Sequence, residues 1–137
     1  MRTADLDDVV RVSRSTMLHP WSRTQFAQEL ICPRGQALVA CGPGPCGYVF
    51  FRFTGEEAEL LQLAVEPAKM GRGIGGQLFY AGIKQLAFEG ITICFLEVRR
   101  ENIRARRFYQ RHGFVEIGRR KKYYRQPVDD AVVMKKE

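Results

Sequence analysis

Apolar residues in the first 31 positions recur at helical intervals, and the pattern predicts two helices separated by a break at His19-Pro20. The first helix has Asp5 as its expected capping residue. The second begins after Ser22, which forms a capping-box pattern with Gln25, and Pro33 stops it.

The middle of the chain changes to short apolar runs punctuated by glycine and proline, which is typical of strands and turns. Residues 37–41 and 46–53 flank a Gly-Pro-Gly-Pro segment as a hairpin, and Thr54-Gly55 turns the chain into a third strand over 56–65. A glycine-rich turn then leads into a helix whose apolar stripe contains Leu78, Phe79, Gly82, Ile83 and Leu86.

The last third of the chain predicts a strand, a helix and two further strands. Residues 92–98 are apolar on both faces apart from Glu97, as expected of a central strand covered by helices on each side. Asn102 is the expected cap of the next helix, and Gly113 ends it. One face of that helix is apolar, and the other carries Arg104, Arg107 and Arg111. The final strands are expected over 114–124 and 131–135, joined through Pro127 and Asp129-Asp130.

The glycine-rich turn, Met70-Gly71-Arg72-Gly73-Ile74-Gly75-Gly76, is the main candidate for chemistry. Free backbone amides at the start of the following helix can bind an anion, and glycine lets that anion come close. The turn lacks the lysine and hydroxyl residue of a nucleotide-triphosphate loop, and it comes too late in the chain for a dinucleotide fold. Taken alone, it fits an anion site and an ordinary turn equally well.

Length and composition bound these alternatives. With 137 residues, the chain is expected to form one domain, residues 1–137. It has no run of 18 apolar residues and no signal-peptide pattern, so we expect a cytoplasmic protein without a membrane segment. Cys32, Cys41, Cys46 and Cys94 fit no zinc spacing and are expected to be buried free thiols, with no metal site.

The net charge of +7 is concentrated in residues 99–100, 104–111 and 119–125. Such a surface fits a polyanionic partner, or a basic bias that also serves a nucleotide-bearing cofactor. The second interpretation is preferred over direct nucleic-acid binding, because no known binding module is apparent.

Three segments together resemble the GNAT family of acetyl-CoA-dependent N-acetyltransferases: the glycine turn, the strand with Glu97, and the run from Glu101 to Phe114. The resemblance covers nearly the whole chain. Within the family, four shorter motifs look like the ribosomal-protein-alanine N-acetyltransferases of the RimI type. They are Pro20-Trp21-Ser22, Leu96-Glu97-Val98-Arg99, Lys122-Tyr123-Tyr124 and Asp130-Ala131-Val132-Val133-Met134.

The resemblance implies an α/β (α+β) fold, the GNAT acyl-CoA N-acyltransferase fold, with helices on both faces of a mixed, mostly antiparallel sheet. The sheet would splay between the strands ending at Val65 and Val98, and the pantetheine arm of acetyl-CoA would lie in the gap. The backbone of Leu63, Ala64 and Val65 would pair with that arm, Asn102 would contact coenzyme A, and Tyr109 would lie near the thioester sulfur. The pyrophosphate would be cradled by Gly71, Arg72, Gly73, Ile74, Gly75 and Gly76.

Two features depart from the family pattern. Met70 stands where the family usually has Gln or Arg, which leaves Lys69 and Arg72 as candidates for a side-chain contact to phosphate. Residues 1–4 leave little of the family's first strand, so that edge of the sheet is expected to be reduced.

Acetyl transfer to an amine needs a neutral amine and a proton for the departing thiolate. An N-terminal amine has a reference pKa of about 7.7 to 8.0, so a modest base suffices. Glu97 is the candidate base, partly desolvated on its strand with a raised pKa. The alternative is a strand-end carboxylate paired with Arg99 or another arginine; the residues alone leave this open, and the resemblance favours the base.

Tyr109 is the candidate proton donor to the leaving thiolate, and the alternative is a core tyrosine with a satisfied hydroxyl. Periodicity alone favours the core role, and the resemblance favours the donor. Cys94 is not assigned as a nucleophile, because no covalent intermediate is needed and an apolar setting keeps a thiol protonated. Backbone amides of the split strand are expected to stabilise the oxyanion.

Trp21, Tyr123 and Tyr124 are candidates for the acceptor groove, with packing at the sheet rim as the alternative. His19 and His112 are expected to be structural. The expected function is acetyl transfer to the N-terminal amine of a protein, with the alanine of a ribosomal protein as acceptor. The alternatives are an acetyltransferase for a small-molecule amine or a lysine side chain, and a non-enzymatic module that binds CoA or RNA.

Overall fold

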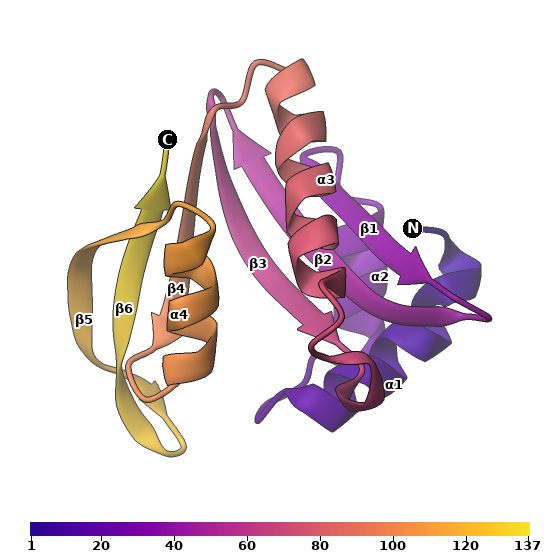
Figure 1. The fold of residues 1–137 in the computed structure, drawn as a ribbon, viewed down its shortest axis with the longest axis horizontal. Helices are drawn as coiled ribbons and strands as arrows, with labels where there is room; N and C mark the ends of the chain where they lie inside the picture. Colours follow the sequence, from indigo (N-terminus) through magenta and orange to yellow (C-terminus); the bar gives the residue numbers. More distant parts are fainter.

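One six-stranded mixed sheet organises the computed structural model, which describes residues 1–137 (Figure 1). Its strands are β1 (Gly35–Cys41), β2 (Pro45–Thr54), β3 (Glu57–Val65), β4 (Ile93–Arg99), β5 (Val115–Arg125) and β6 (Val128–Lys136). Their spatial order is β1-β2-β3-β4-β6-β5, and only the β3–β4 pair is parallel. The mixed, mostly antiparallel sheet expected from the family resemblance is therefore confirmed.

The helices divide between the two faces of this sheet. They are α1 (Leu6–Thr16), α2 (Arg23–Leu30), α3 (Ile74–Phe88) and α4 (Ile103–Arg111), with short 3-10 turns at Thr3–Asp5 and Pro67–Lys69. In Figure 1, α1 and α2 lie behind β1 to β3, whereas α3 and α4 lie in front of the sheet. No helix in the structure is long and apolar enough to cross a membrane.

Two hydrophobic clusters fill the spaces between the sheet and these helices. The cluster under α1 and α2 includes Phe26, Tyr48 and Phe50. The larger cluster, under α3 and α4, includes Phe51 and Tyr109. Neighbouring residues of β2 therefore point into different clusters, as alternation along a strand requires.

Local hydrogen bonds show why the helices begin where they do. The capping box predicted at Ser22 and Gln25 is present, with the Gln25 N–H donating to the Ser22 hydroxyl. Asn102 caps α4 by accepting from the Ala105 N–H at 3.3 Å. The prediction for Asp5 is wrong in its contact: Asp5 precedes α1, but its carboxylate accepts from the Arg2 N–H and not from the helix.

Two further expectations are corrected by the fold. β6 already begins at Val128, so Asp129 and Asp130 belong to the strand and the turn is confined to Gln126-Pro127. β4 is covered by helices on one face only: Cys94, Leu96 and Val98 are buried, whereas the residues that alternate with them are half-buried. The strand has apolar residues on both faces, and this pattern alone does not show that one of the faces lacks a helix.

The close packing of α3 on the sheet depends on a glycine. A Cβ atom added to Gly82 would lie 2.4 Å from Cε2 of Phe51, a fully buried ring. We expect Gly82→Ala to lower the free energy of unfolding by about 1–3 kcal/mol, as overpacking of a dense core does. Helix propensity alone predicts the opposite sign, since alanine is favoured over glycine by about 1 kcal/mol.

Urea unfolding of the purified variants measures this effect. Ala81→Gly, at the exposed neighbouring position of α3, measures the effect of helix propensity on stability without a steric clash against Phe51. Equal or higher stability of Gly82→Ala would show that the helix does not pack against Phe51 as described.

The sheet splays apart at its parallel pair. β3 and β4 are paired only through Glu57, Ala58 and Glu59 opposite Ile93, Cys94 and Phe95. A bulge in the β2–β3 register, between Phe50 and Phe51, lies close to the point of separation. Beyond Glu59, β3 therefore has a strand partner on its β2 side alone, as the family resemblance predicts.

Candidate active site

A cleft of about 600 Å³ opens where β3 and β4 separate. One wall is the end of β3, the floor is the glycine turn with the start of α3, and the opposite wall is α4. Aliphatic and aromatic side chains, among them Leu63, Val65 and Phe108, make up much of its lining. The cleft is thus a slot with an apolar interior and a polar end.

The polar end is the glycine turn. None of the backbone N–H groups from Gly71 to Gly76 donates a hydrogen bond to another protein group; the first bonded donor of α3 is Gln77, to the Gly73 carbonyl. Gly71 and Gly73 both have φ of +79°, a conformation that favours glycine. A run of free donors at the positive end of a helix fits a phosphate or pyrophosphate group.

Glycine also lets the start of α3 approach α4. A Cβ atom on Gly75 would lie 3.4 Å from Cε2 of Phe108, and one on Gly76 would lie 3.1 Å from Nε2 of His112. His112 in turn stacks on Phe108 at 4.2 Å, and its Nδ1 hydrogen-bonds the Phe108 carbonyl. His112, expected to be purely structural, therefore also lines the cleft.

Most residues predicted to bind the cofactor line this one cleft. They are Leu63, Ala64, Val65, Gly71, Gly73, Ile74, Gly75, Gly76 and Asn102. Arg72 is the exception, because its side chain lines a neighbouring pocket together with Arg11 and Glu66. Met70 stands where the family usually has Gln or Arg. Of the two side chains that could make the phosphate contact in its place, only Lys69 lines the cleft.

Tyr109 projects from α4 into the larger hydrophobic cluster and lines the cleft. It packs edge-on against Phe108 and Phe114, at 5.4 and 5.6 Å between ring centroids, and its hydroxyl has no protein partner. Burial, followed by the influence of Cys94 and Tyr124, raises the pKa of its phenol well above the ordinary value. The hydroxyl therefore keeps its proton at neutral pH and can donate it into the cleft.

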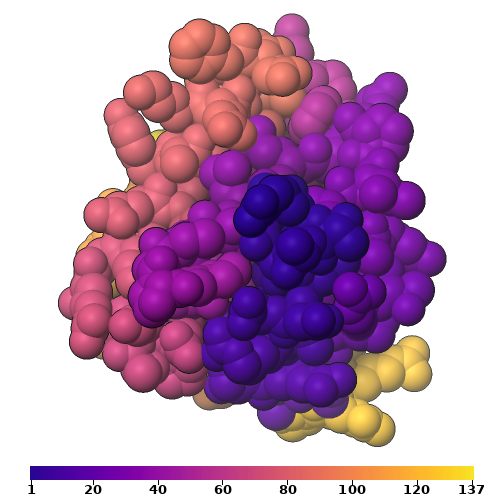
Figure 2. Space-filling model, turned by 90° about the vertical axis from the view of Figure 1, so that its right-hand side faces the viewer, coloured from indigo at the N-terminus to yellow at the C-terminus, as the bar shows by residue number.

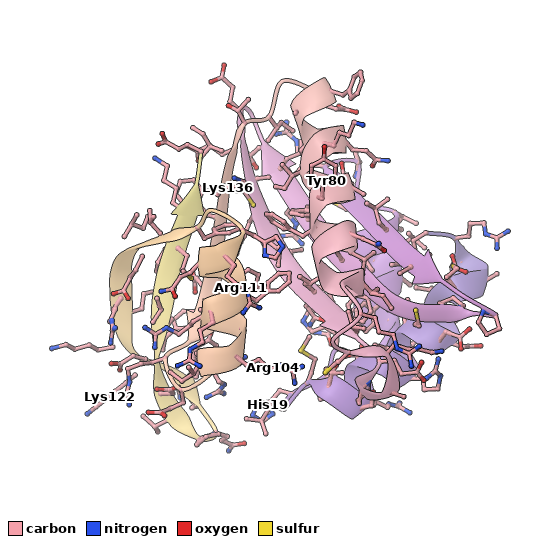
Figure 3. All side chains as sticks on the ribbon, in the orientation of Figure 1. His19, Tyr80, Arg104, Arg111, Lys122 and Lys136 are labelled. Atoms are coloured by element: carbon pink, nitrogen blue, oxygen red, sulfur yellow. The ribbon has the colours of Figure 1, made fainter.

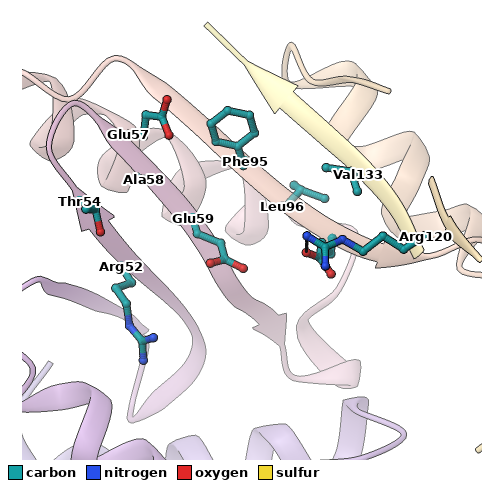
Figure 4. Close-up of a pocket in the computed structure, with 10 residues that line it drawn as sticks. Arg52, Thr54, Glu57, Ala58, Glu59, Phe95, Leu96, Arg120 and Val133 are labelled. Carbon is teal, nitrogen blue, oxygen red and sulfur yellow. Dashed lines mark ion pairs between the residues drawn. The ribbon is translucent and has the colours of Figure 1, made fainter. Parts of the chain in front are cut away.

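Glu97 lies on the opposite face of β4, the face without a helix. Figure 4 shows the pocket that it lines, with Phe95 on β4 and Arg120 on β5. Its side chain is 22% exposed, and Oε1 lies 3.5 Å from an Nη atom of Arg120 on β5. The alternative of an arginine-paired carboxylate is thus present in the structure, with Arg120 and not Arg99 as the partner. Glu97 and Tyr109 lie on opposite faces of the sheet and line different pockets.

Tyr123 and Tyr124 lie beside Glu97. The Glu97 carboxylate is the largest cause of a raised pKa for Tyr123, and it adds to burial in raising the pKa of Tyr124 to about 12. The Arg99 guanidinium lies 4.3 Å from the centre of the Tyr124 ring. These tyrosines are placed to contact an amine that approaches Glu97, and their role as an acceptor groove remains a prediction.

Trp21 is placed differently from the two tyrosines. Its ring packs against Phe26 and Phe50 at 5.3 and 6.1 Å, on the α1–α2 side of the sheet. This is the packing alternative, and nothing in the structure brings Trp21 to Glu97. His19, in the same loop, contacts the Gln126 carbonyl of the β5–β6 turn. Figure 2 shows that turn, in yellow, at the lower edge of the indigo N-terminal face.

Two neighbouring aspartates of β6 hold the backbone around these side chains. Asp129, nearly buried, accepts hydrogen bonds from the N–H groups of Glu101 and Asp130, and the Glu101 contact is the main reason that its pKa is lowered. It thereby fixes the loop that precedes α4. Asp130 accepts from the N–H of Lys122, whose left-handed φ of +51° lies in the β5 bulge that precedes Tyr124.

All four cysteines are free, but only Cys46 and Cys94 are buried. Cys32 is half-buried and Cys41 is exposed, so the expectation of buried thiols holds for two of the four. Burial raises the pKa of Cys94 to about 12, and its thiol therefore stays protonated. No group of three or more His, Cys, Asp or Glu side chains is arranged to hold a metal ion.

Arg104 and Arg111 are cleft residues that the sequence interpretation placed on the outer face of α4. A helical projection separates apolar from charged positions, but residues at the border of the two can face a ligand. The seven-residue spacing of the two arginines, which puts them on the same side of the helix, was the signal available in the sequence.

Comparison with known proteins agrees with this architecture. Residues 6–114 match the model of the acetyltransferase (GNAT) family. The chain is 33% identical over 123 residues to the N-alpha-acetyltransferase RimI of Mycobacterium tuberculosis, covering 86% of this chain and 76% of that protein. It is 27% identical over 136 residues to the ribosomal protein bS18-alanine N-acetyltransferase of Salmonella typhimurium, covering 98% and 92%. The crystal structure of the ribosomal-protein-S18-alanine N-acetyltransferase from Escherichia coli is similar with a TM-score of 0.91 at 27% identity, covering 99% of this chain and 89% of that one.

Proposed function

The chain belongs to the acetyltransferase (GNAT) family and is an acetyl-CoA-dependent N-acetyltransferase, and on this premise we propose that its acceptor is the N-terminal α-amine of a protein. The N-terminal alanine of a ribosomal protein is the proposed substrate. The relatives named as ribosomal-protein-alanine N-acetyltransferases, which match nearly the full length of this chain, support this choice. A cytoplasmic location belongs to the same proposal.

The observation that carries the proposal is the splay of β3 and β4, with the free N–H groups of the glycine turn at one end, Tyr109 on the face covered by α4, and Glu97 on the opposite face. The free N–H groups of Gly71 to Gly76 fit the pyrophosphate of the cofactor. The unpaired edge of β3 at Leu63 to Val65 fits its extended amide arm. When bound, acetyl-CoA supplies an acetyl group activated as a thioester.

Each side chain then has a distinct task. The Glu97 carboxylate accepts a proton from the acceptor amine, directly or through a water, because only the neutral amine is nucleophilic. The Tyr109 hydroxyl holds the proton that the departing sulfur needs. Backbone N–H groups of the split strand stabilise charge on the reacting carbonyl oxygen. Tyr123 and Tyr124 orient the acceptor beside Glu97.

A panel of matched acceptors tests the choice of substrate. We expect turnover of a peptide that begins with a free alanine. A peptide of the same sequence with a blocked N-terminus and an internal lysine, and a polyamine such as spermidine, are expected to give little turnover. Acetylation of the blocked peptide or of the polyamine at comparable kcat/KM would point to a lysine or small-molecule acetyltransferase instead.

A further inference from the structure

We infer that Arg104 and Arg111 on α4 bind the 3′-phosphate of the cofactor, a contact that neither the glycine turn nor Met70 supplies. The inference rests on the proposed use of acetyl-CoA and concerns one further subsite of the same cleft. It assigns a role to two arginines that the transfer chemistry leaves unused.

Both arginines lie on the side of α4 that borders the cleft. They flank Phe108, itself a cleft residue, and line the same space as the glycine turn opposite. Figure 3 shows both side chains at the edge of α4 that faces the gap toward β3 and α3. The two guanidinium groups therefore face the turn across the cleft.

Neither guanidinium is engaged elsewhere in the protein. Arg100, Arg106, Arg119 and Arg120, on the neighbouring segments, all form ion pairs with carboxylates. Arg104 and Arg111 form no ion pair and no side-chain hydrogen bond to a protein group. Two like charges kept unpaired on one wall of a cleft favour an anionic ligand over a neutral one.

The nucleotide end of coenzyme A carries a phosphate group in addition to the pyrophosphate that the glycine turn can bind. Its pyrophosphate matches the free N–H groups of Gly71 to Gly76, whereas its 3′-phosphate is a separate group with about −1.5 to −2 charges at neutral pH. Guanidinium groups bind phosphate oxygens through paired, charge-assisted hydrogen bonds. Met70 offers no charge and Arg72 lines another pocket, so the cationic side chains of the cleft are Lys69, beside the turn, and the two arginines on the wall formed by α4.

Arg107 provides a matched control on the same helix. It has the same charge, is exposed and forms no ion pair, but it does not line the cleft. A general effect of net charge on ligand attraction would appear equally in Arg104→Ala, Arg107→Ala and Arg111→Ala. A specific contact would appear only in the first and third.

The test compares CoA with dephospho-CoA, which lacks only the 3′-phosphate, by isothermal titration calorimetry on each variant. We expect wild type to prefer CoA by about tenfold, and Arg104→Ala and Arg111→Ala each to lose several-fold affinity for CoA, with little change for dephospho-CoA. The double variant is expected to bind both ligands equally, and Arg107→Ala is expected to retain the wild-type preference.

Equal losses for CoA and dephospho-CoA would overturn the inference, because the arginines would then serve the pyrophosphate or the fold. A double variant that keeps the preference for CoA would also overturn it. If wild type bound neither ligand, the proposed function itself would fail, and this outcome is distinct from both of the others.

Discussion

Glu97→Gln is expected to lower kcat by about 100-fold or more while leaving the affinity for acetyl-CoA nearly unchanged, because general-base catalysis typically contributes 10²–10⁴. The amide keeps the shape of the side chain on β4 but cannot accept the proton of the amine. The deficit should shrink as the pH rises above about 8, where an N-terminal amine is neutral without help. Steady-state kinetics with an alanine-starting peptide from pH 6.5 to 9.5 measures both effects.

Two variants separate this role from the ion pair with Arg120. Glu59→Gln removes a carboxylate that lines the same pocket, and it should retain near-normal turnover. Arg120→Ala breaks the ion pair of Glu97 but spares its carboxylate, so it should cost far less than Glu97→Gln. Equal losses in Arg120→Ala and Glu97→Gln, with equal falls in melting temperature, would mean that Glu97 has a structural role.

Tyr109→Phe is the second large expected effect, a fall in kcat of about 100-fold with unchanged affinity for CoA, because the departing sulfur would lose its proton donor. The raised pKa of the buried phenol keeps Tyr109 protonated through neutral and mildly alkaline pH. The ratio of wild-type to variant kcat should therefore stay constant between pH 6.5 and 9. Single-turnover kinetics at saturating acetyl-CoA isolates this step from product release.

Tyr80→Phe is the matched control, because Tyr80 is exposed on α3 and does not line the cleft. Tyr124→Phe tests the neighbouring hydroxyl, whose pKa is raised by burial and by the Glu97 carboxylate. A Tyr109→Phe variant with normal turnover, alongside an inactive Tyr124→Phe variant, would transfer the donor role to Tyr124. Reduced stability of Tyr109→Phe would instead support the role of a core tyrosine.

The features that the sequence predicted correctly are mostly local. The capping box at Ser22 and the cap at Asn102 each link residues three positions apart, so their chemistry is visible in a short window. The order of helices and strands follows from periodicity for the same reason. Asp5 shows that even a local prediction can fail, because its carboxylate accepts from the Arg2 N–H and not from an N–H group at the start of α1.

The features that the sequence missed depend on contacts between distant segments. Which face of β4 lacks a helix is decided by the crossover between β3 and β4, so Glu97 was expected to be more enclosed than it is. Arg72 lines a neighbouring pocket, whereas Arg104 lines the cleft. Both placements depend on how α3 packs against α4. The family resemblance predicted where the cleft lies, but it did not predict which way the side chains of Arg72 and Arg104 point.

The central claim is that the acetyl group goes to a protein α-amine, and mass spectrometry of acetylated N-termini tests it most directly. Purified protein would be incubated with isotopically labelled acetyl-CoA and a cell extract, with Glu97→Gln as the matched control. We predict label on the N-terminal α-amine of one or a few proteins that begin with alanine, ribosomal proteins among them, and its loss with the variant. Label confined to lysine side chains or small amines, or equal labelling by the variant, would contradict the account.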